Sequence, residues 1–167
     1  MRAAATLAAT FALLGAILAV LNDLLAPCQV HLYAAGLFVA GAVFSWPTAA
    51  GGAALFLAGC VADANAPPEL FGAQTALFCA AYLVLRALPR RFPGEETSAR
   101  VAAALAINLA LFLALSALRG ARYPDPGAAA LRLGFELAAS ELFVALAAPW
   151  FFALQARALA LARARPE

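Results

Sequence analysis

The chain has 167 residues, of which 66% are hydrophobic and 12% are charged, and its formal net charge is +2. A soluble domain of this size cannot bury so much apolar surface, and its exposed patches would aggregate in water. All eleven basic residues are arginines that stand mainly beside apolar runs, which is typical of membrane anchors and not of a nucleic-acid surface. We therefore expect one integral membrane domain, residues 1–167, of all-α class.

Six apolar segments are candidates for helices that cross a hydrocarbon core about 30 Å thick. They are residues 3–21, 30–46, 49–62, 71–88, 101–118 and 131–154. The connections between them are short, so neighbouring segments should run in opposite directions. The sequence thus predicts a polytopic six-helix transmembrane bundle.

The first segment ends at Asn22, Asp23 and Pro27. Its alanines at 4, 8, 12 and 16 share one helical face, a spacing that lets two membrane helices approach closely. Alanine is common throughout the chain, so a packing face and a chance spacing remain equal alternatives.

The second and third segments form a tight pair. The second stops at Pro47, and Trp46 before it suits a headgroup boundary. The third is short and opens on Gly51 and Gly52, so it barely crosses at 1.5 Å per residue. It must use flanking residues, thin the bilayer or pack inside the protein.

A hairpin joins the third and fourth segments. The third ends on Gly59 and Asp63, two prolines and Glu69 follow in the turn, and the fourth opens on Gly72. Asp63 can satisfy backbone N–H groups beyond the end of its helix. The alternative is that Asp63 and Glu69 contact a partner protein, and both roles are compatible.

The arginines predict an orientation. With six spans, eight arginines share one side, whereas Arg119, Arg122 and Arg132 lie on the other. The eight are Arg2, Arg86, Arg90, Arg91, Arg100, Arg157, Arg163 and Arg165. The positive-inside rule places both termini in the cytoplasm and the Asp63 hairpin outside, with Arg86, Arg90 and Arg91 as the strongest topology anchor.

Three polar side chains interrupt the apolar segments: Gln74, Asn108 and Glu141. We expect them to hydrogen-bond between helices, although Glu141 near the midplane could instead carry a proton or meet a partner helix or a ligand. Glu136 should pair with Arg132 four residues earlier.

No catalytic constellation or phosphate-binding glycine loop is evident, and the three cysteines and one histidine lack metal-ligand spacing. We expect no enzyme, no cofactor and no metal site.

The stretch from Gly59 to Phe92 resembles the bacterial rod shape-determining protein MreD family. In that family a span ends in G-x-x-x-D, a short turn follows, and a glycine opens a span that closes on arginines. Gly59 and Asp63 match the first part, Leu70-Phe71-Gly72 the second, and Arg86, Arg90 and Arg91 the last. The family usually has large aliphatic residues after the acid, where this chain has Ala64-Asn65 and then two prolines.

The resemblance implies a non-enzymatic scaffold of the cell-elongation complex in the bacterial inner membrane. Its implied partners are a single-span MreC-like protein and, directly or through it, MreB, RodA and a penicillin-binding transpeptidase. The family is also similar in fold to the substrate-binding components of energy-coupling factor transporters, so a vitamin-binding component is the alternative function. A proton-coupled carrier using Glu141 ranks last, because the paired broken helices and internal repeat of such carriers are not evident.

Overall fold

The computed structural model describes residues 2–64, 66–87, 96–120 and 126–164. Across these ranges the chain is all-helical, with six α-helices, two short 3-10 turns and no strand. The helices are α1 (Arg2–Leu25), α2 (Ala35–Ser45), α3 (Thr48–Ala64), α4 (Ala73–Ala87), α5 (Thr97–Gly120) and α6 (Pro126–Ala164). The 3-10 turns η1 (Ala26–Cys28) and η2 (Pro68–Leu70) follow α1 and precede α4. The predicted all-α class is confirmed.

Prolines mark several helix boundaries. Pro47 separates α2 from α3, and Pro126 opens α6, where its missing N–H costs no intrahelical hydrogen bond. Pro149 is different, because it lies inside α6 and the helix continues beyond it to Ala164. The sixth helix is therefore much longer at both ends than the predicted segment 131–154.

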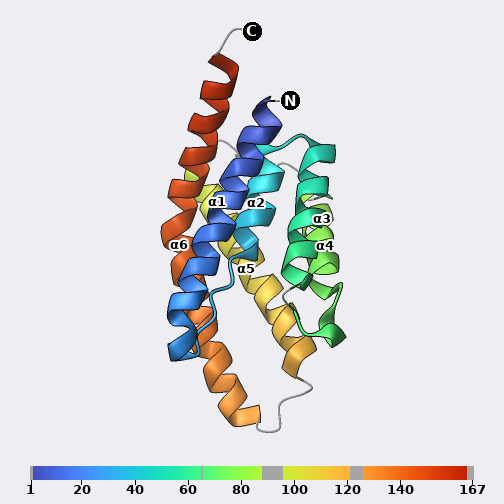
Figure 1. Cartoon of the computed structure of the whole chain (residues 1–167), viewed down its shortest axis with the longest axis vertical. Coiled ribbons are helices and arrows are strands. Elements are labelled where there is room, and N and C mark those ends of the chain that lie inside the picture. Colours follow the sequence, from blue (N-terminus) through green and yellow to red (C-terminus); the bar gives the residue numbers. More distant parts are fainter. Residues whose placement is uncertain (1, 65, 88–95, 121–125, 165–167) are drawn as a thin grey trace.

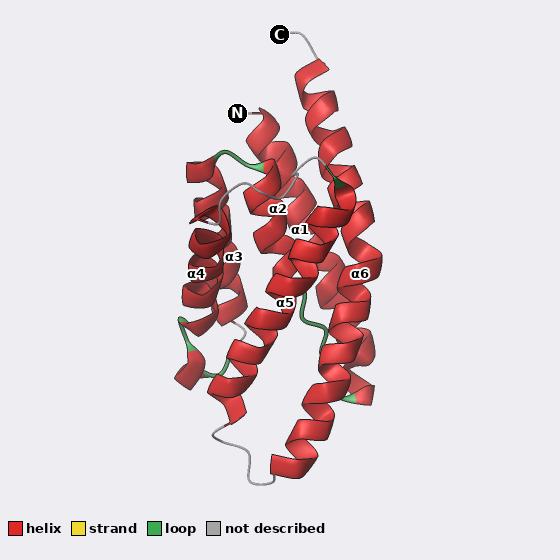
Figure 2. Cartoon of the chain, turned by 180° about the vertical axis from the view of Figure 1, so that it is seen from behind, coloured by secondary structure: helices red, strands yellow, loops and turns green. Residues whose placement is uncertain are grey.

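The helices alternate in direction, and α2 lies at the centre (Figures 1 and 2). It packs against α3, α4, α5 and α6, while α1 lies on α6 and α5 crosses the bundle obliquely. The start of α1 and the end of α6 lie at the same end of the bundle, as an even number of antiparallel helices requires. The α3–α4 hairpin lies at the opposite end.

Three of the six helices are long and apolar enough to cross a membrane: Ala5–Cys28, Thr97–Arg119 and Ala130–Leu161. The others are shorter, with 11 residues in α2, 17 in α3 and 15 in α4. At 1.5 Å per residue, α3 and α4 extend about 25 and 22 Å, less than the roughly 30 Å of a hydrocarbon core. The predicted number of helices is thus confirmed across the described residues, but only three of the six helices, not all six, are long and apolar enough to be spans.

The second predicted segment, residues 30–46, is wrong in its first part, because α2 begins only at Ala35. Gln29 has a left-handed backbone, and residues 30–34 run without helical structure. Side chains of α1, α5 and α6 form hydrogen bonds with the backbone of this segment in place of the hydrogen bonds that a helix would make. Local apolar pattern does not reveal such distant partners.

Trp46 was expected at a headgroup boundary, and it stands directly after the end of α2 but is buried within the bundle. Only 9% of its surface is exposed, and its ring lies 5.4 Å from that of Phe11 in α1. The tryptophan follows the last residue of α2 and therefore points into the bundle with it. Trp150, by contrast, is 81% exposed.

The α1 helix buries one stripe of large residues, and its outward face carries both alanines and large residues such as Leu13 and Ile17. Leu7, Phe11, Leu14 and Leu18 face the core, whereas Ala8, Ala12 and Ala16 are exposed. The alanines therefore do not pack within this chain. A Cβ added to Gly15, beside them in sequence, would meet nothing within 4 Å.

Candidate functional site

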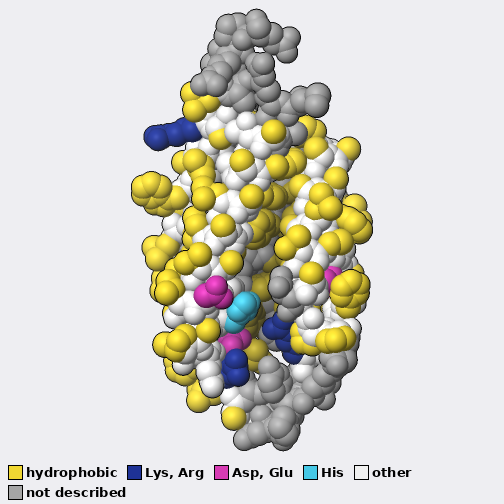
Figure 3. Space-filling model, viewed as in Figure 1, with side chains coloured by type: hydrophobic (Ala, Val, Ile, Leu, Met, Phe, Trp, Pro, Cys, Tyr) yellow, Lys and Arg dark blue, Asp and Glu magenta, His cyan; other side chains and the backbone are white. Residues whose placement is uncertain are grey.

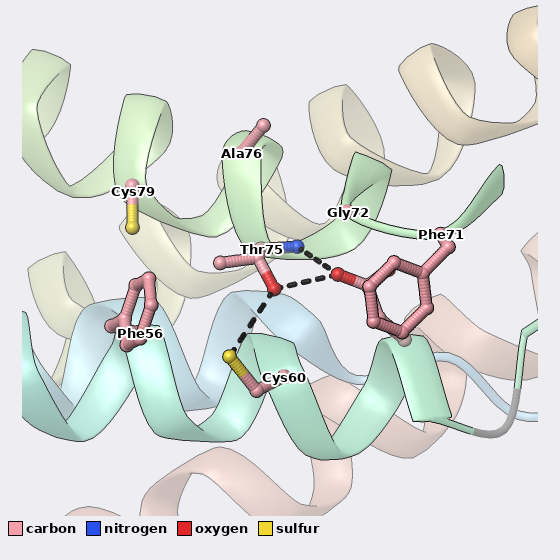
Figure 4. Close-up of a pocket in the computed structure, with 8 residues that line it drawn as sticks. Phe56, Cys60, Phe71, Gly72, Thr75, Ala76 and Cys79 are labelled. Atoms are coloured by element: carbon pink, nitrogen blue, oxygen red, sulfur yellow. Dashed lines mark hydrogen bonds between the residues drawn. The ribbon is translucent and has the colours of Figure 1, made fainter.

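The α3–α4 hairpin is held by the carboxylate of Asp63. This side chain is 1% exposed and lies in the last turn of α3. One carboxylate oxygen accepts the Gln74 backbone N–H at 3.0 Å. The other accepts the Thr75 N–H at 3.0 Å and the Thr75 hydroxyl at 2.6 Å, the bonds drawn as dashed lines at Thr75 in Figure 4. Since the first N–H groups of a helix have no intrahelical partners, Asp63 acts as the N-terminal cap of α4.

Two glycines make this geometry possible. A Cβ on Gly59 would lie 2.6 Å from the Thr75 Cα, so α3 and α4 can approach this closely only at a glycine. Gly72 has φ +87°, a conformation that residues with a side chain rarely adopt, and it lets the chain turn into α4. Gly59, Asp63 and Gly72, the residues that carry the family resemblance, thus build a single joint.

Gln74 of α4 forms a second hydrogen bond between the two helices of the hairpin. Its side-chain amide donates to the Ala62 carbonyl at 3.1 Å, so a side chain of α4 partners the C-terminal end of α3 while Asp63 partners the start of α4. The expected interhelical bond of Gln74 is present.

A shallow groove of about 400 Å³ runs along the outside of this joint (Figure 4). Phe56, Phe71, Cys60, Thr75 and Cys79 are among its lining residues, with Cys60 from α3 and Cys79 from α4. The Thr75 hydroxyl also lies 3.9 Å from the Cys60 sulfur. The groove is almost wholly apolar and is open to the surroundings.

A second polar cluster holds the irregular residues 30–34. The Asn22 side chain accepts the Leu32 N–H at 2.7 Å and donates to the Leu32 carbonyl at 3.2 Å. The Ser140 hydroxyl of α6 accepts the Tyr33 N–H at 3.0 Å. Backbone groups without regular secondary structure inside an apolar bundle need other hydrogen-bond partners, and these two side chains supply them.

Asn108 completes this cluster. It is fully buried, accepts the Gly36 N–H at 3.1 Å, and donates to the Tyr33 carbonyl at 3.1 Å and to the Glu141 carboxylate at 3.0 Å. It therefore joins the start of α2 to α5 and α6. The expected interhelical bonds of Asn108 and Glu141 are present, and Glu141 itself is only half-buried.

Charged side chains gather near the outer part of this cluster. Arg132 donates to Glu136 at 3.1 Å, which confirms the predicted pair, and His31 lies within electrostatic reach of Glu136 and Arg119. Figure 3 shows acidic and basic side chains beside the histidine, in the lower part of a face that is otherwise mostly hydrophobic.

Of the predicted arginine anchors, Arg86 lies at the end of α4 and is half-buried. It donates to the Trp46 carbonyl at 3.2 Å and stacks over Tyr82, with 5.5 Å from its guanidinium carbon to the ring centre. Arg90 and Arg91 lie outside the described residues.

Several functional side chains escaped prediction. Thr75 and Ser140 carry no charge, and Asn22 was taken only as the end of a helix, yet each anchors backbone or carboxylate groups far away in sequence. The available signal was weak: a hydroxyl or amide within or next to an apolar run, where it needs a partner.

Comparisons of the chain with protein-family models, curated proteins and solved structures find no match.

Proposed function

We propose that the protein is a non-enzymatic membrane scaffold of the bacterial cell-elongation complex, similar to the MreD family. The observation that carries this proposal is the hairpin joint. Gly59, Asp63 and Gly72 are the residues of the resemblance, and each has a distinct physical task in one joint. If these three residues matched the family motif by chance, there would be no reason for all of them to act in the same joint.

In this proposal the protein spans the inner membrane with both termini in the cytoplasm. The three shorter helices complete a six-span bundle by local thinning of the bilayer or by contact with a partner. Arg86 and Arg100 then lie on the cytoplasmic side with the ends of the chain, and Asp63 lies on the outer side. A reporter fused after Glu167 should be active only in the cytoplasm.

The transmembrane helix of an MreC-like partner would pack against the outward face of α1. Ala8, Ala12 and Ala16 are exposed there, and small residues allow the close helix contacts on which association in lipid depends. MreB, RodA and a penicillin-binding transpeptidase would join through that partner or directly.

The test is co-purification of the MreC-like partner from native membranes. Ala12→Leu should weaken capture, because the larger side chain separates the two helices, whereas Ala106→Leu on an exposed position of α5 serves as the matched control. Depletion of the protein should make rod-shaped cells round. Unchanged shape together with equal capture by both variants would refute the scaffold proposal.

A vitamin-binding transport component is the second candidate. The observation in its favour is the irregular segment 30–34 beside Asn108 and the half-buried Glu141, since ligand sites in membranes often use non-helical backbone. The purified protein would then contain a tightly bound small molecule, detectable by mass spectrometry. Glu141→Gln should express normally and lose that molecule.

A further inference from the structure

The end of the bundle that carries Arg86 contains buried hydrogen-bond donors without acceptors. We call this region the arginine end and define it by Ser45, Trp46, Arg86, Arg100 and Gln155. Three of its buried nitrogens have no hydrogen-bond partner within the described structure: Trp46 Nε1, Arg86 Nε and Gln155 Nε2. Gln155 is 1% exposed and Trp46 is 9% exposed, so bulk water does not reach these donors.

These side chains are connected to one another. Arg86 donates through its terminal nitrogen to the Trp46 carbonyl, and the Ser45 hydroxyl, one residue earlier in the chain, donates to Gln155 at 2.8 Å. The Phe11 ring packs against the Trp46 ring, and a Cβ added to Gly41 would lie 3.1 Å from Phe11 and 3.2 Å from Gln155 Nε2. Phe11 thus connects Trp46 with the side of α2 where Gln155 lies. The three unpaired donors therefore belong to side chains at one end of the bundle, from the end of α2, from α4 and from α6.

The arginine end carries positive charge, and its unpaired groups are hydrogen-bond donors, so both features favour a negatively charged acceptor. Within the described parts of the chain no carboxylate pairs with Arg86, and its positive charge is balanced only by the Trp46 carbonyl and the Tyr82 ring. Arg100 lies at the same end, 5.8 Å from the centre of the Phe44 ring. All three unsatisfied groups are donors, so the missing partner is an acceptor, and the guanidinium favours an anionic one.

We propose that the arginine end binds an anionic phosphate group, with Arg86 as its outer contact and the Trp46 indole N–H as an inner donor. Gln155 lies deepest and supplies the last donor. Because the donors are closed off in the unliganded protein, neighbouring side chains must turn aside as the phosphate enters. Basic sites between membrane helices bind phospholipid headgroups in this way, and free phosphate offers the same chemistry. The proposal does not rest on the scaffold function.

The experiment uses the full chain in a neutral detergent and native mass spectrometry. Three probes are titrated: phosphatidylglycerol, diacylglycerol with the same acyl chains but no phosphate, and inorganic phosphate. One phosphatidylglycerol should bind saturably and diacylglycerol should not. Saturation by inorganic phosphate in place of the lipid would identify free phosphate as the ligand of the same site.

Two variants locate the site, and one controls for charge. Arg86→Gln should weaken binding about tenfold, since a charge-assisted bond is lost, and Trp46→Phe, which keeps the ring, should weaken it about fivefold. Arg132→Gln removes the same charge at the opposite end and should change affinity by less than about twofold. Thermal unfolding of each variant reports on its folding separately.

Equal binding of phosphatidylglycerol and diacylglycerol, or equal losses in Arg86→Gln and Arg132→Gln, would overturn the phosphate site. So would unchanged affinity in a folded Trp46→Phe protein.

Discussion

The hairpin joint and the arginine end differ in how their buried polar groups are paired. In the hairpin, Asp63 is buried and both of its oxygens accept hydrogen bonds from α4. At the arginine end, the donors of Trp46, Arg86 and Gln155 are buried without acceptors. A carboxylate whose oxygens are all hydrogen-bonded holds two helices together. Donors without acceptors, by contrast, can still form hydrogen bonds to a bound partner. Polarity alone therefore does not separate structural from binding groups.

The hairpin should lose the most stability when its carboxylate is removed. Asp63→Ala leaves the Gln74 and Thr75 N–H groups buried without a partner, which should lower the free energy of unfolding by about 3 kcal/mol. The measurement is unfolding in mixed micelles with increasing denaturing detergent. Asp63→Asn retains one acceptor oxygen and should lose about half as much. Asp23→Ala, at an exposed position, should change stability by less than about 0.5 kcal/mol. Equal stability of the Asp63→Ala and Asp23→Ala proteins would show that the cap contributes nothing.

The close approach of α3 and α4 should be the next most sensitive feature. Gly59→Ala places a methyl group against the Thr75 backbone and should cost about 2 kcal/mol, because the helices must separate. The same micelle unfolding assay measures this loss. Gly15→Ala is the matched control, since its added methyl group meets open space, and it should stabilise α1 by up to about 1 kcal/mol. If both substitutions changed the free energy of unfolding in the same direction, the close contact between α3 and α4 at Gly59 would be contradicted.

The smallest change in stability is expected at the arginine end. Trp46→Phe removes an indole N–H that already lacks a partner, so no hydrogen bond is lost. The smaller ring leaves a gap against Phe11, and the free energy of unfolding should fall by about 1 kcal/mol without added lipid. Unfolding with and without phosphatidylglycerol measures this directly. The wild type should be stabilised by the lipid more than the variant. A loss as large as that of Asp63→Ala would mean that Trp46 donates to a structural acceptor, and the contrast between the hairpin joint and the arginine end would disappear.

The order of apolar and charged residues along the sequence was enough to predict two features: the helices in continuous apolar runs and the Arg132–Glu136 pair. Both depend on residues that are close in sequence. The same pattern was also enough to mark Asp63 as a partner for backbone N–H groups. It failed at residues 30–34, which adjoin the apolar run of α2 but are held outside the helix by Asn22, Asn108 and Ser140 from three other helices. It also gave no sign that the Trp46 ring packs against Phe11, which lies far away in sequence in α1. Contacts distant in sequence decided both cases.

The segment at 30–34 also constrains the order in which the chain matures. Its backbone partners Asn108 and Ser140 are made roughly two thirds of the chain or more after the first helix begins, and ribosomes add only about 5 to 20 residues each second. During synthesis the newly made α1 and α2 must therefore wait for several seconds with Tyr33 lacking its native contacts. An insertase or chaperone that shelters this portion would act on the nascent protein before α5 and α6 emerge.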